Sequence, residues 1–192
     1  MHLENGWISG VKRVPSPHCD TRPDHEAPSL LVVHNISLPP GRFGGPYIDR
    51  LFTGTLNPDD HPFFQQIYQL RVSAHCLIRR DGEIVQYVPF DQRAWHAGVS
   101  AFAGRERCND FSIGVELEGT DNLPFTDTQY CRLAALTLLL MQHFPITPAR
   151  ITGHSDIAPG RKTDPGPAFM WHHYRQLISR RADRDNRENP GS

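Results

Sequence analysis

The sequence has no long apolar run, and its first residues do not show the pattern of a leader. No stretch approaches the roughly 18 apolar residues of a membrane span, and residues 1–7 lack the basic head and apolar core of a secretory signal. An excess of charge of one sign is also missing, since 20 Lys and Arg are balanced by 21 Asp and Glu, for a formal net charge of -1. Without a broad positive field the chain is a poor match for nucleic acid or an anionic membrane. We therefore expect a cytoplasmic protein that binds neither.

Cysteines are few and none belongs to a Cys-x-x-Cys pair. The four, far apart in the chain, are Cys19, Cys76, Cys108 and Cys131. This spacing argues against a disulfide scaffold and a structural zinc knuckle, so isolated reduced thiols are expected. A chain of 192 residues is long enough to bury one sizeable core. We predict a monomer with one domain over residues 1–179.

Strand patterns occur in the first two thirds of the chain. Residues 30–33 form a short, continuously apolar run, which is typical of a strand covered on both faces. Two further runs, 72–78 and 84–88, flank an Asp-Gly turn signal and predict an antiparallel hairpin. Residues 111–118 alternate apolar and polar side chains, which predicts a strand in which Gly114 leaves open space beside Glu116.

Two helices are expected in the last third. Residues 126–144 begin with a capping-box pattern and continue with apolar residues at helical spacing until a proline. A second helix is predicted from about Pro167 to about Ser179, with Met170, Tyr174 and Leu177 buried. Residues 180–192 are charged and lack apolar periodicity, so we expect a flexible tail there.

Two segments rich in proline and glycine are predicted to be irregular. Residues 8–29 should form an extended arm over the surface. The connection at about 35–62 is long for a compact domain, and such connections are often substrate-covering lids. An ordered surface excursion held by its own aromatic residues is an equally good interpretation of the same segment.

A candidate metal site comes from three residues far apart in the chain. His34 ends the first apolar run, and His154 and Asp164 belong to a stretch whose prolines and glycines force the backbone to curl. Two imidazoles and a carboxylate are suitable ligands for a catalytic zinc, which keeps a fourth position open for water. Packed or exposed histidines are the alternative, and Asp164 before Pro165-Gly166 could equally form a turn.

Glu116 and Lys162 could supply the remaining chemistry of amide hydrolysis. That reaction needs a group to accept and deliver the proton of a water, and a positive charge to face the developing oxyanion. Lys162 alone would more simply be a solvated loop lysine. Glu116 lies in a predicted central strand, where its carboxylate needs a buried partner or a cleft.

A third group of residues would suit an anionic, partly apolar ligand. Arginine binds carboxylates in bidentate fashion, and tryptophan offers a flat apolar face. Arg71, His75, Trp95 and Arg107 are the candidates for substrate binding. Each could instead be surface or core, and His75 could also be a fourth metal ligand or a packed residue.

Five motifs in a fixed order resemble one enzyme family. They are a strand ending in His34-Asn35, Ala94 to Gly98, Asn109 to Glu116, Thr152 to His154, and Arg161 to Gly166. Together they resemble the zinc-dependent N-acetylmuramoyl-L-alanine amidases, a family that includes phage lysozyme-type amidases and peptidoglycan recognition proteins. The resemblance spans roughly residues 5 to 178.

The resemblance implies an α/β fold with a mixed central β-sheet flanked by helices. It implies zinc bound by His34, His154 and Asp164, and a catalytic pair of Glu116 and Lys162. The implied reaction cleaves the amide between the lactyl group of 1,6-anhydro-N-acetylmuramic acid and L-alanine of the stem peptide, in cytoplasmic peptidoglycan recycling, with an indirect effect on β-lactamase induction. Asn35 joins the expected substrate-binding residues through its place beside the first motif.

The rival interpretation is a non-catalytic module that binds muramyl peptides on the same fold. Binding-only relatives typically lack the third metal-binding side chain, whereas Asp164 is present here. The sequence therefore favours an enzyme. A different metallohydrolase on an unrelated fold would not share the ordered motifs.

Overall fold

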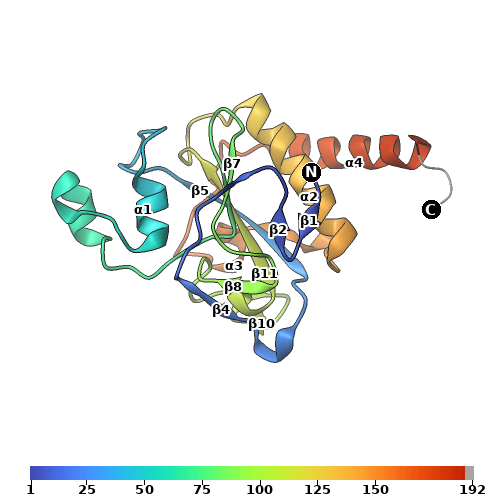
Figure 1. Ribbon diagram of the computed structural model, residues 1–192. Helices are drawn as coiled ribbons and strands as arrows, with labels where there is room; N and C mark the ends of the chain where they lie inside the picture. The colour runs from blue at the N-terminus through green and yellow to red at the C-terminus, as the bar shows by residue number, and fades with distance from the viewer. Residues whose placement is uncertain (189–192) are drawn as a thin grey trace.

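A six-stranded mixed sheet forms the centre of the computed structural model, which describes residues 1–188 (Figure 1). In spatial order the strands are β12 (Ile151–Gly153), β5 (Leu30–Ile36), β11 (Ser112–Glu118), β6 (Cys76–Ile78), β7 (Ile84–Gln86) and β3 (Lys12–Arg13). The first four are parallel to one another, and β7 is antiparallel to β6, as the predicted hairpin requires. The predicted mixed sheet is therefore confirmed.

β11 is buried along its whole length because it lies between two parallel neighbours. Its alternation is the predicted one: Ile113, Val115 and Leu117 belong to the main apolar core. The intervening residues, Gly114 and Glu116, therefore face the opposite side of the sheet. One face of the central strand thus packs the core, and the other carries the candidate chemistry.

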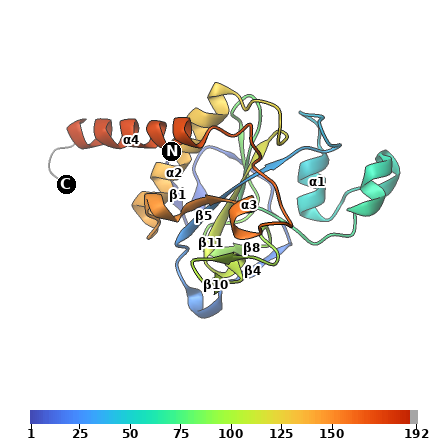
Figure 2. The same cartoon turned by 180° about the vertical axis from the view of Figure 1, so that it is seen from behind.

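The main core lies between the sheet and two long helices, α2 (Asp127–His143) and α4 (Trp171–Glu188), which lie together on one side of the molecule in both views (Figures 1 and 2). The predicted capping box is present, because the Thr126 hydroxyl accepts from the amide of Gln129 and the Gln129 side chain accepts from the amide of Thr126. These bonds satisfy two amides that a helix start leaves without partners.

The second helix differs from the prediction at both ends. It begins at Trp171 and not near Pro167, because the amide of Ala168 donates to the carbonyl of Asp121 and holds this stretch in a turn. Met170 consequently precedes the helix and is 53% exposed, whereas Tyr174 is buried as predicted. The helix continues to Glu188, well beyond the expected end.

The charged sequence after Ser179 explains this extension. Arg and Asp or Glu recur there at a spacing of four residues, which supports a helix without any apolar face. Much of the stretch expected to be a tail is therefore helical, and residues 189–192 lie outside the described part of the chain. None of the helices in residues 1–188 is long and apolar enough to cross a membrane.

The N-terminal arm is extended but does not simply lie over the surface. Its short strands are β1 (Leu3–Glu4), β2 (Trp7–Ile8), β3 and β4 (Cys19–Thr21), followed by the 3-10 turn η1 (Pro23–His25). β3 extends the central sheet, and β4 pairs with β8 (Gln92–Ala94). Arg22 is only 1% exposed and donates to the carbonyls of Phe90 and Asn109. The arm is thus fixed to the body by pairing and by a buried guanidinium, which polarity patterns alone did not indicate.

The long segment at 35–62 folds around helix α1 (Tyr47–Thr53), on the side of the sheet away from α2 and α4 (Figures 1 and 2). Leu51 and Phe52 of α1 pack in a second apolar cluster with Phe64, Leu77 and other residues. The 3-10 turns η2 (Pro58–Asp60) and η3 (Pro62–Gln66) complete this region. The segment is therefore ordered, and it packs on apolar residues of the sheet, such as Leu77 and Val85, as well as on its own.

The remaining elements are short. They are β9 (Ala101–Phe102), β10 (Arg105–Glu106), η4 (Cys108–Asp110), η5 (Pro148–Arg150) and α3 (His154–Ile157). All four cysteines are free, as expected from their spacing.

Candidate metal centre and active site

Three parallel strands bring the candidate residues to one edge of the sheet. His34 of β5 is directly opposite Glu116 of β11. On the other side of β5, Gly153 of β12 is opposite Val33, so His154, the next residue, lies beside His34. Carboxyl ends of parallel strands commonly carry the sites of α/β proteins. The strand register alone therefore places two imidazoles and a carboxylate together.

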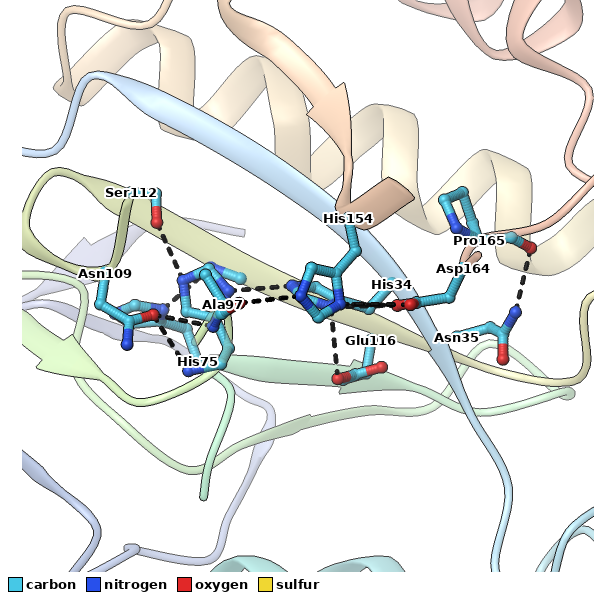
Figure 3. A network of polar contacts seen from close by, with 12 residues as sticks. His34, Asn35, His75, Ala97, Asn109, Ser112, Glu116, His154, Asp164 and Pro165 are labelled. Atoms are coloured by element: carbon cyan, nitrogen blue, oxygen red, sulfur yellow. Dashed lines mark hydrogen bonds and ion pairs between the residues drawn. The ribbon is translucent and has the colours of Figure 1, made fainter. Parts of the chain in front are cut away.

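His34, His154 and Asp164 meet at a single point (Figure 3). The Nδ1 atoms of the two histidines are 3.0 Å apart, and Asp164 Oδ2 is 3.1 Å from the first and 3.2 Å from the second. Both imidazoles are buried, while Asp164 is partly exposed. The structure thus brings together all three of the predicted metal ligands.

The hydrogen bonding of this group fits a cation among the three atoms. His154 Nε2 is 3.0 Å from the carbonyl oxygen of Ala97, which can only accept, so in the neutral ring this nitrogen carries the proton and Nδ1 presents a lone pair. That lone pair faces the carboxylate of Asp164, which also offers only lone pairs when ionised. Two acceptors in contact repel unless a positive charge lies between them. The donor set therefore suits a divalent metal ion.

The charge states near neutral pH favour the same conclusion. Burial lowers the pKa of His34 despite its contact with Asp164, so this imidazole is neutral. Burial would raise the pKa of Asp164, but its contacts with His154 and His34 lower it well below its usual range. Neutral imidazoles and an ionised carboxylate are the forms that bind metal.

Glu116 is buried beside this group without a donor for one of its oxygens. Its Oε1 is 3.8 Å from His34 Nδ1, and its buried Oε2 has no hydrogen-bond partner among residues 1–188. Burial, together with the negative charge of Asp164, raises the pKa of Glu116 well above the ordinary value, and Lys162 partly offsets the shift. An unsatisfied buried carboxylate is costly, which marks this position for a role other than stability.

The curled segment from His154 to Gly166 is closed by its own backbone. The amide of Ser155 donates to the carbonyl of Asp164, and the amide of Lys162 donates to the carbonyl of Ala158. Gly166 has a φ of +84° and passes so close to Asp121 that a Cβ would lie 2.3 Å from the Asp121 Cα. The predicted curl is present, and a glycine is required at its end.

Asp121 is a residue that sequence reasoning missed. Its carboxylate accepts a hydrogen bond of 2.7 Å from the side-chain amide of Asn35 and one of 2.5 Å from the Thr163 hydroxyl. The side-chain amide of Asn35 also donates to the carbonyl of Pro165. These bonds fasten the curled segment to the end of β5. No pattern signals Asp121 in the sequence, because it follows β11 in an irregular stretch.

His96 belongs to the motif at Ala94 to Gly98 but had no role assigned from the sequence, and it fills the space expected at Gly114. Its Nδ1 is 2.9 Å from His34 Nε2, and its Nε2 is 2.9 Å from Ser112 Oγ. A Cβ on Gly114 would lie 2.5 Å from His96 Cγ, so the space is not open, as expected from the sequence, but holds this ring. A glycine in a central strand was the available signal, since it often marks close approach of another group.

A cleft of about 430 Å³ opens over these residues. Its walls include Leu51 and Phe52 from the α1 segment, and the exposed Lys162 lines the same cleft as Glu116. Asn35 and Trp95, two of the predicted substrate-binding residues, also line it. The cleft therefore combines a metal-binding group, a buried acid, a lysine and an apolar wall.

The other predicted substrate-binding residues lie farther out or are inaccessible. The guanidinium of Arg71 lies 5.8 Å from the ring centroid of Trp95, while Arg107 lines a neighbouring pocket of about 550 Å³ that shares Arg161 with the cleft.

His75 cannot contact a substrate, because it is fully buried and does not line the cleft. It accepts from the amide of Gly114 and contacts the carbonyl of Gln92, and burial lowers its pKa to about 3. It also lies outside the group of three potential metal ligands. Its prediction as a substrate-binding residue or fourth ligand was wrong: His75 is packed just before β6 (Cys76–Ile78), which is the alternative that the sequence left open.

The family model for N-acetylmuramoyl-L-alanine amidases matches residues 24–167, which include every residue of the metal group. The chain belongs to this family. The resemblance stated from the five motifs is thereby confirmed. The family's fold also matches, since the same mixed sheet with flanking helices occurs in the solved relatives.

Close relatives of this amidase cover nearly its whole length. The chain is 69% identical to 1,6-anhydro-N-acetylmuramyl-L-alanine amidase AmpD of Escherichia coli K12 over 94% of this chain and 98% of that protein. It is similar to the crystal structure of a selenomethionine derivative of AmpD, with 67% identity, a TM-score of 0.91, and coverage of 93% and 99%. A more distant amidase, AmiD of E. coli, has been solved with the substrate anhydro-N-acetylmuramic acid-L-Ala-D-gamma-Glu-L-Lys, with 30% identity, a TM-score of 0.58, and coverage of 79% and 58%.

Proposed function

We propose that this protein is a zinc-dependent hydrolase that cleaves the amide between the lactyl group of 1,6-anhydro-N-acetylmuramic acid and L-alanine of the stem peptide. The observation that carries the proposal is the convergence of two buried imidazoles and Asp164 beside a buried carboxylate that has an unpartnered oxygen. The bond follows from the family, whose members are named for cleaving N-acetylmuramoyl-L-alanine.

His34, His154 and Asp164 would hold the zinc. Two nitrogens and one oxygen form a ligand set used by catalytic zinc sites with one open position. A bound zinc supplies a lowered pKa for water and a positive charge near the scissile carbonyl. The chain's own contribution is to hold the three donor atoms close together in a buried pocket.

Glu116 would act as the general base and then the general acid. Its carboxylate lies next to the metal group, so it can accept a proton from the attacking water and deliver it to the departing amine of alanine. A positive charge nearby favours its ionised form, which its burial alone opposes. Lys162 lines the same cleft, and its ammonium would face the oxyanion of the tetrahedral intermediate.

The substrate would be a 1,6-anhydro-muramyl peptide in cytoplasmic peptidoglycan recycling, with an indirect effect on β-lactamase induction. The names of the AmpD relatives, at up to 69% identity over nearly the full chain, support this choice. Asn35 and Trp95 in the cleft, with Arg71 and Arg107 at its margins, would contact the ligand. We further propose that residues 1–179 work as one monomeric catalytic domain in which the segment at 35–62 covers the bound substrate.

Product release tests the proposal directly. The protein is incubated with anhydro-muramyl tripeptide or with intact wall polymer, and the products are identified by mass spectrometry. We expect free tripeptide from the first substrate, loss of release after dialysis against a strong chelator, and recovery when zinc is added. Binding of the intact muramyl tripeptide without cleavage would instead identify a recognition module.

Two variants separate the metal site from general damage to the fold. Asp164→Ala should lose tightly bound zinc, measured by elemental analysis, together with hydrolysis. Asp183→Asn on α4, which lies outside the cleft, should keep both. Chelator-resistant activity in the wild-type protein would contradict the proposed mechanism.

A further inference from the structure

Both histidines of the metal group contact one short segment, His96-Ala97. His34 Nε2 lies 2.9 Å from the side chain of His96, and His154 Nε2 lies 3.0 Å from the carbonyl oxygen of Ala97. The segment is itself fixed, because the side-chain oxygen of Asn109 accepts from the amides of His96 and Ala97 at 3.1 Å and 2.8 Å. One segment thus contacts the outward nitrogen of each imidazole.

We propose that His96 is a positioning residue of the metal centre. It accepts a hydrogen bond from His34 Nε2 on its own Nδ1 and donates from Nε2 to Ser112 Oγ. Through this relay it holds the ring of His34 so that Nδ1 faces His154 and Asp164. The inference rests on the proposed function, since it assumes that these three residues bind the metal ion.

The donor and acceptor in each of the two hydrogen bonds of His96 follow from the number of protons on each ring. A neutral imidazole has one N–H and one lone pair. If His34 uses Nδ1 to bind a cation, its N–H must be on Nε2, and His96 Nδ1 must accept. His96 then carries its own N–H on Nε2, where Ser112 Oγ is the acceptor. The choice of ligand atom on His34 therefore sets both rings.

The surroundings of His96 indicate a built position. Its ring lies edge-on to His34, with centroids 5.0 Å apart and an interplanar angle of 84°. Behind it, Gly114 leaves room that any side chain would remove. Outer partners of metal-bound histidines fix the tautomer and orientation of the ligand, and their loss typically weakens metal binding by about 10- to 100-fold.

The test compares an apolar replacement with one that keeps an acceptor. Leucine in His96→Leu fills similar space without any polar atom. Asparagine in His96→Asn can place its side-chain oxygen near the position of Nδ1. Zinc affinity of the full-length protein is measured by competition with a chromogenic chelator, and the absorption spectrum of the cobalt-substituted protein reports ligand geometry. We expect His96→Leu to bind zinc about 10- to 100-fold more weakly, with an altered cobalt spectrum, and His96→Asn to recover most of the loss.

A merely structural histidine would give a different result. If His96 only packs, the leucine and asparagine variants should have the same zinc affinity, whether or not the metal-free proteins melt at lower temperatures. Equal affinities would therefore overturn the inference, and wild-type affinity in His96→Leu would do so as well.

Ser112→Ala provides a second route should the His96 variants fail to fold. It removes the far end of the relay without changing either ring, and we expect a smaller but measurable loss of zinc affinity. Thr137→Ala is the matched control, because Thr137 is a buried hydroxyl in α2 that bonds Tyr174 and does not line the cleft. It should lower the melting temperature and leave zinc affinity unchanged.

The outcomes distinguish failure of this inference from failure of the proposed function. A wild-type protein that fails to bind zinc would remove the proposed metal site. Wild-type zinc binding with unchanged affinity in His96→Leu and Ser112→Ala would remove only the role of His96.

Discussion

Two glutamates on β11, Glu116 and Glu118, are two residues apart and both buried, yet their surroundings are opposite. The carboxylate of Glu118 accepts three hydrogen bonds, from the Arg79 guanidinium at 2.9 Å and from the amides of Gly44 and Arg80 at 2.9 Å and 3.2 Å. Glu116 has an oxygen without any donor, and its other oxygen is 3.8 Å from an imidazole. One carboxylate is fully satisfied, and the other is not.

The difference separates a structural acid from one reserved for chemistry. Glu118 joins the 35–62 segment to the sheet. Its carboxylate accepts from Gly44 of that segment and from Arg79, which follows β6, and Arg79 also donates to the carbonyl of Gly45. Such charge-assisted bonds stabilise the fold. Glu116 instead raises the free energy of the metal-free protein, a cost that a role in proton transfer would explain.

The largest predicted effect is the loss of turnover in Glu116→Gln. The amide cannot accept the proton of the attacking water, so we expect turnover to fall by about 10²- to 10⁴-fold, the usual contribution of a general acid or base. Zinc content, measured by elemental analysis, should stay at the wild-type value, since Glu116 is not among the three metal ligands.

Glu118→Gln is the matched control for that substitution. It changes the same side chain on the same strand, and its product release should fall by a far smaller factor. Comparable losses in the two variants would break the comparison, because the satisfied glutamate would then be as important for turnover as the unsatisfied one.

The next largest effect concerns stability, and we expect it for Glu118→Gln and not for Glu116→Gln. Glu118→Gln replaces a charged acceptor that has an ion pair and two amide donors, so we expect the free energy of unfolding to fall by roughly 1.5 to 3 kcal/mol. For a domain of this size that corresponds to a melting temperature lower by roughly 3 to 12 °C. Glu116→Gln should not be destabilised in the same metal-free assay, and a drop as large as that of Glu118→Gln would contradict the contrast.

The last effect is a pH dependence of stability that comes from Glu116. Its pKa in the folded protein is raised above the ordinary value of 4.5, so the folded state holds this proton more tightly than the unfolded chain does. The associated stability is fully present below pH 4.5 and is lost as the pH rises toward the raised pKa, with a slope of up to about 1.4 kcal/mol per pH unit.

Denaturant titrations of the metal-free wild type and Glu116→Gln over this pH range measure that slope. We expect the stability advantage of the variant to grow with pH above 4.5. A difference that stays constant with pH would show that Glu116 is ionised in the metal-free protein and that its burial costs less than the geometry indicates.

The predictable part of the site is the part carried by strand order. His34 at the end of an apolar run and Glu116 in an alternating strand could be assigned from pattern, and the five motifs supplied the family and the fold. The curl between His154 and Gly166 was predictable because proline and glycine limit the backbone there. These features are local in sequence, and local patterns can be interpreted without coordinates.

The missed features depend on contacts between distant segments. His96 meets His34 across 62 residues, and Asp121 meets Asn35 across 86, so neither partnership leaves a spacing signal. The helical stretch after Ser179 was missed because apolar periodicity was the criterion, whereas the helix continues there through charged residues. His75 was placed wrongly because the sequence pattern did not show that its ring is enclosed by distant residues, among them Arg22 and Gln92.

The parallel register of β5, β11 and β12 has a consequence for biosynthesis. These strands come from the first, middle and last parts of the chain, and the metal group needs all of them together with the segment that ends at Gly166. A nascent polypeptide still lacking its final third has His34 and Glu116 but neither of their partners. The three-residue group can therefore assemble only after residues up to 166 have been synthesised, and shorter translation products lack part of it.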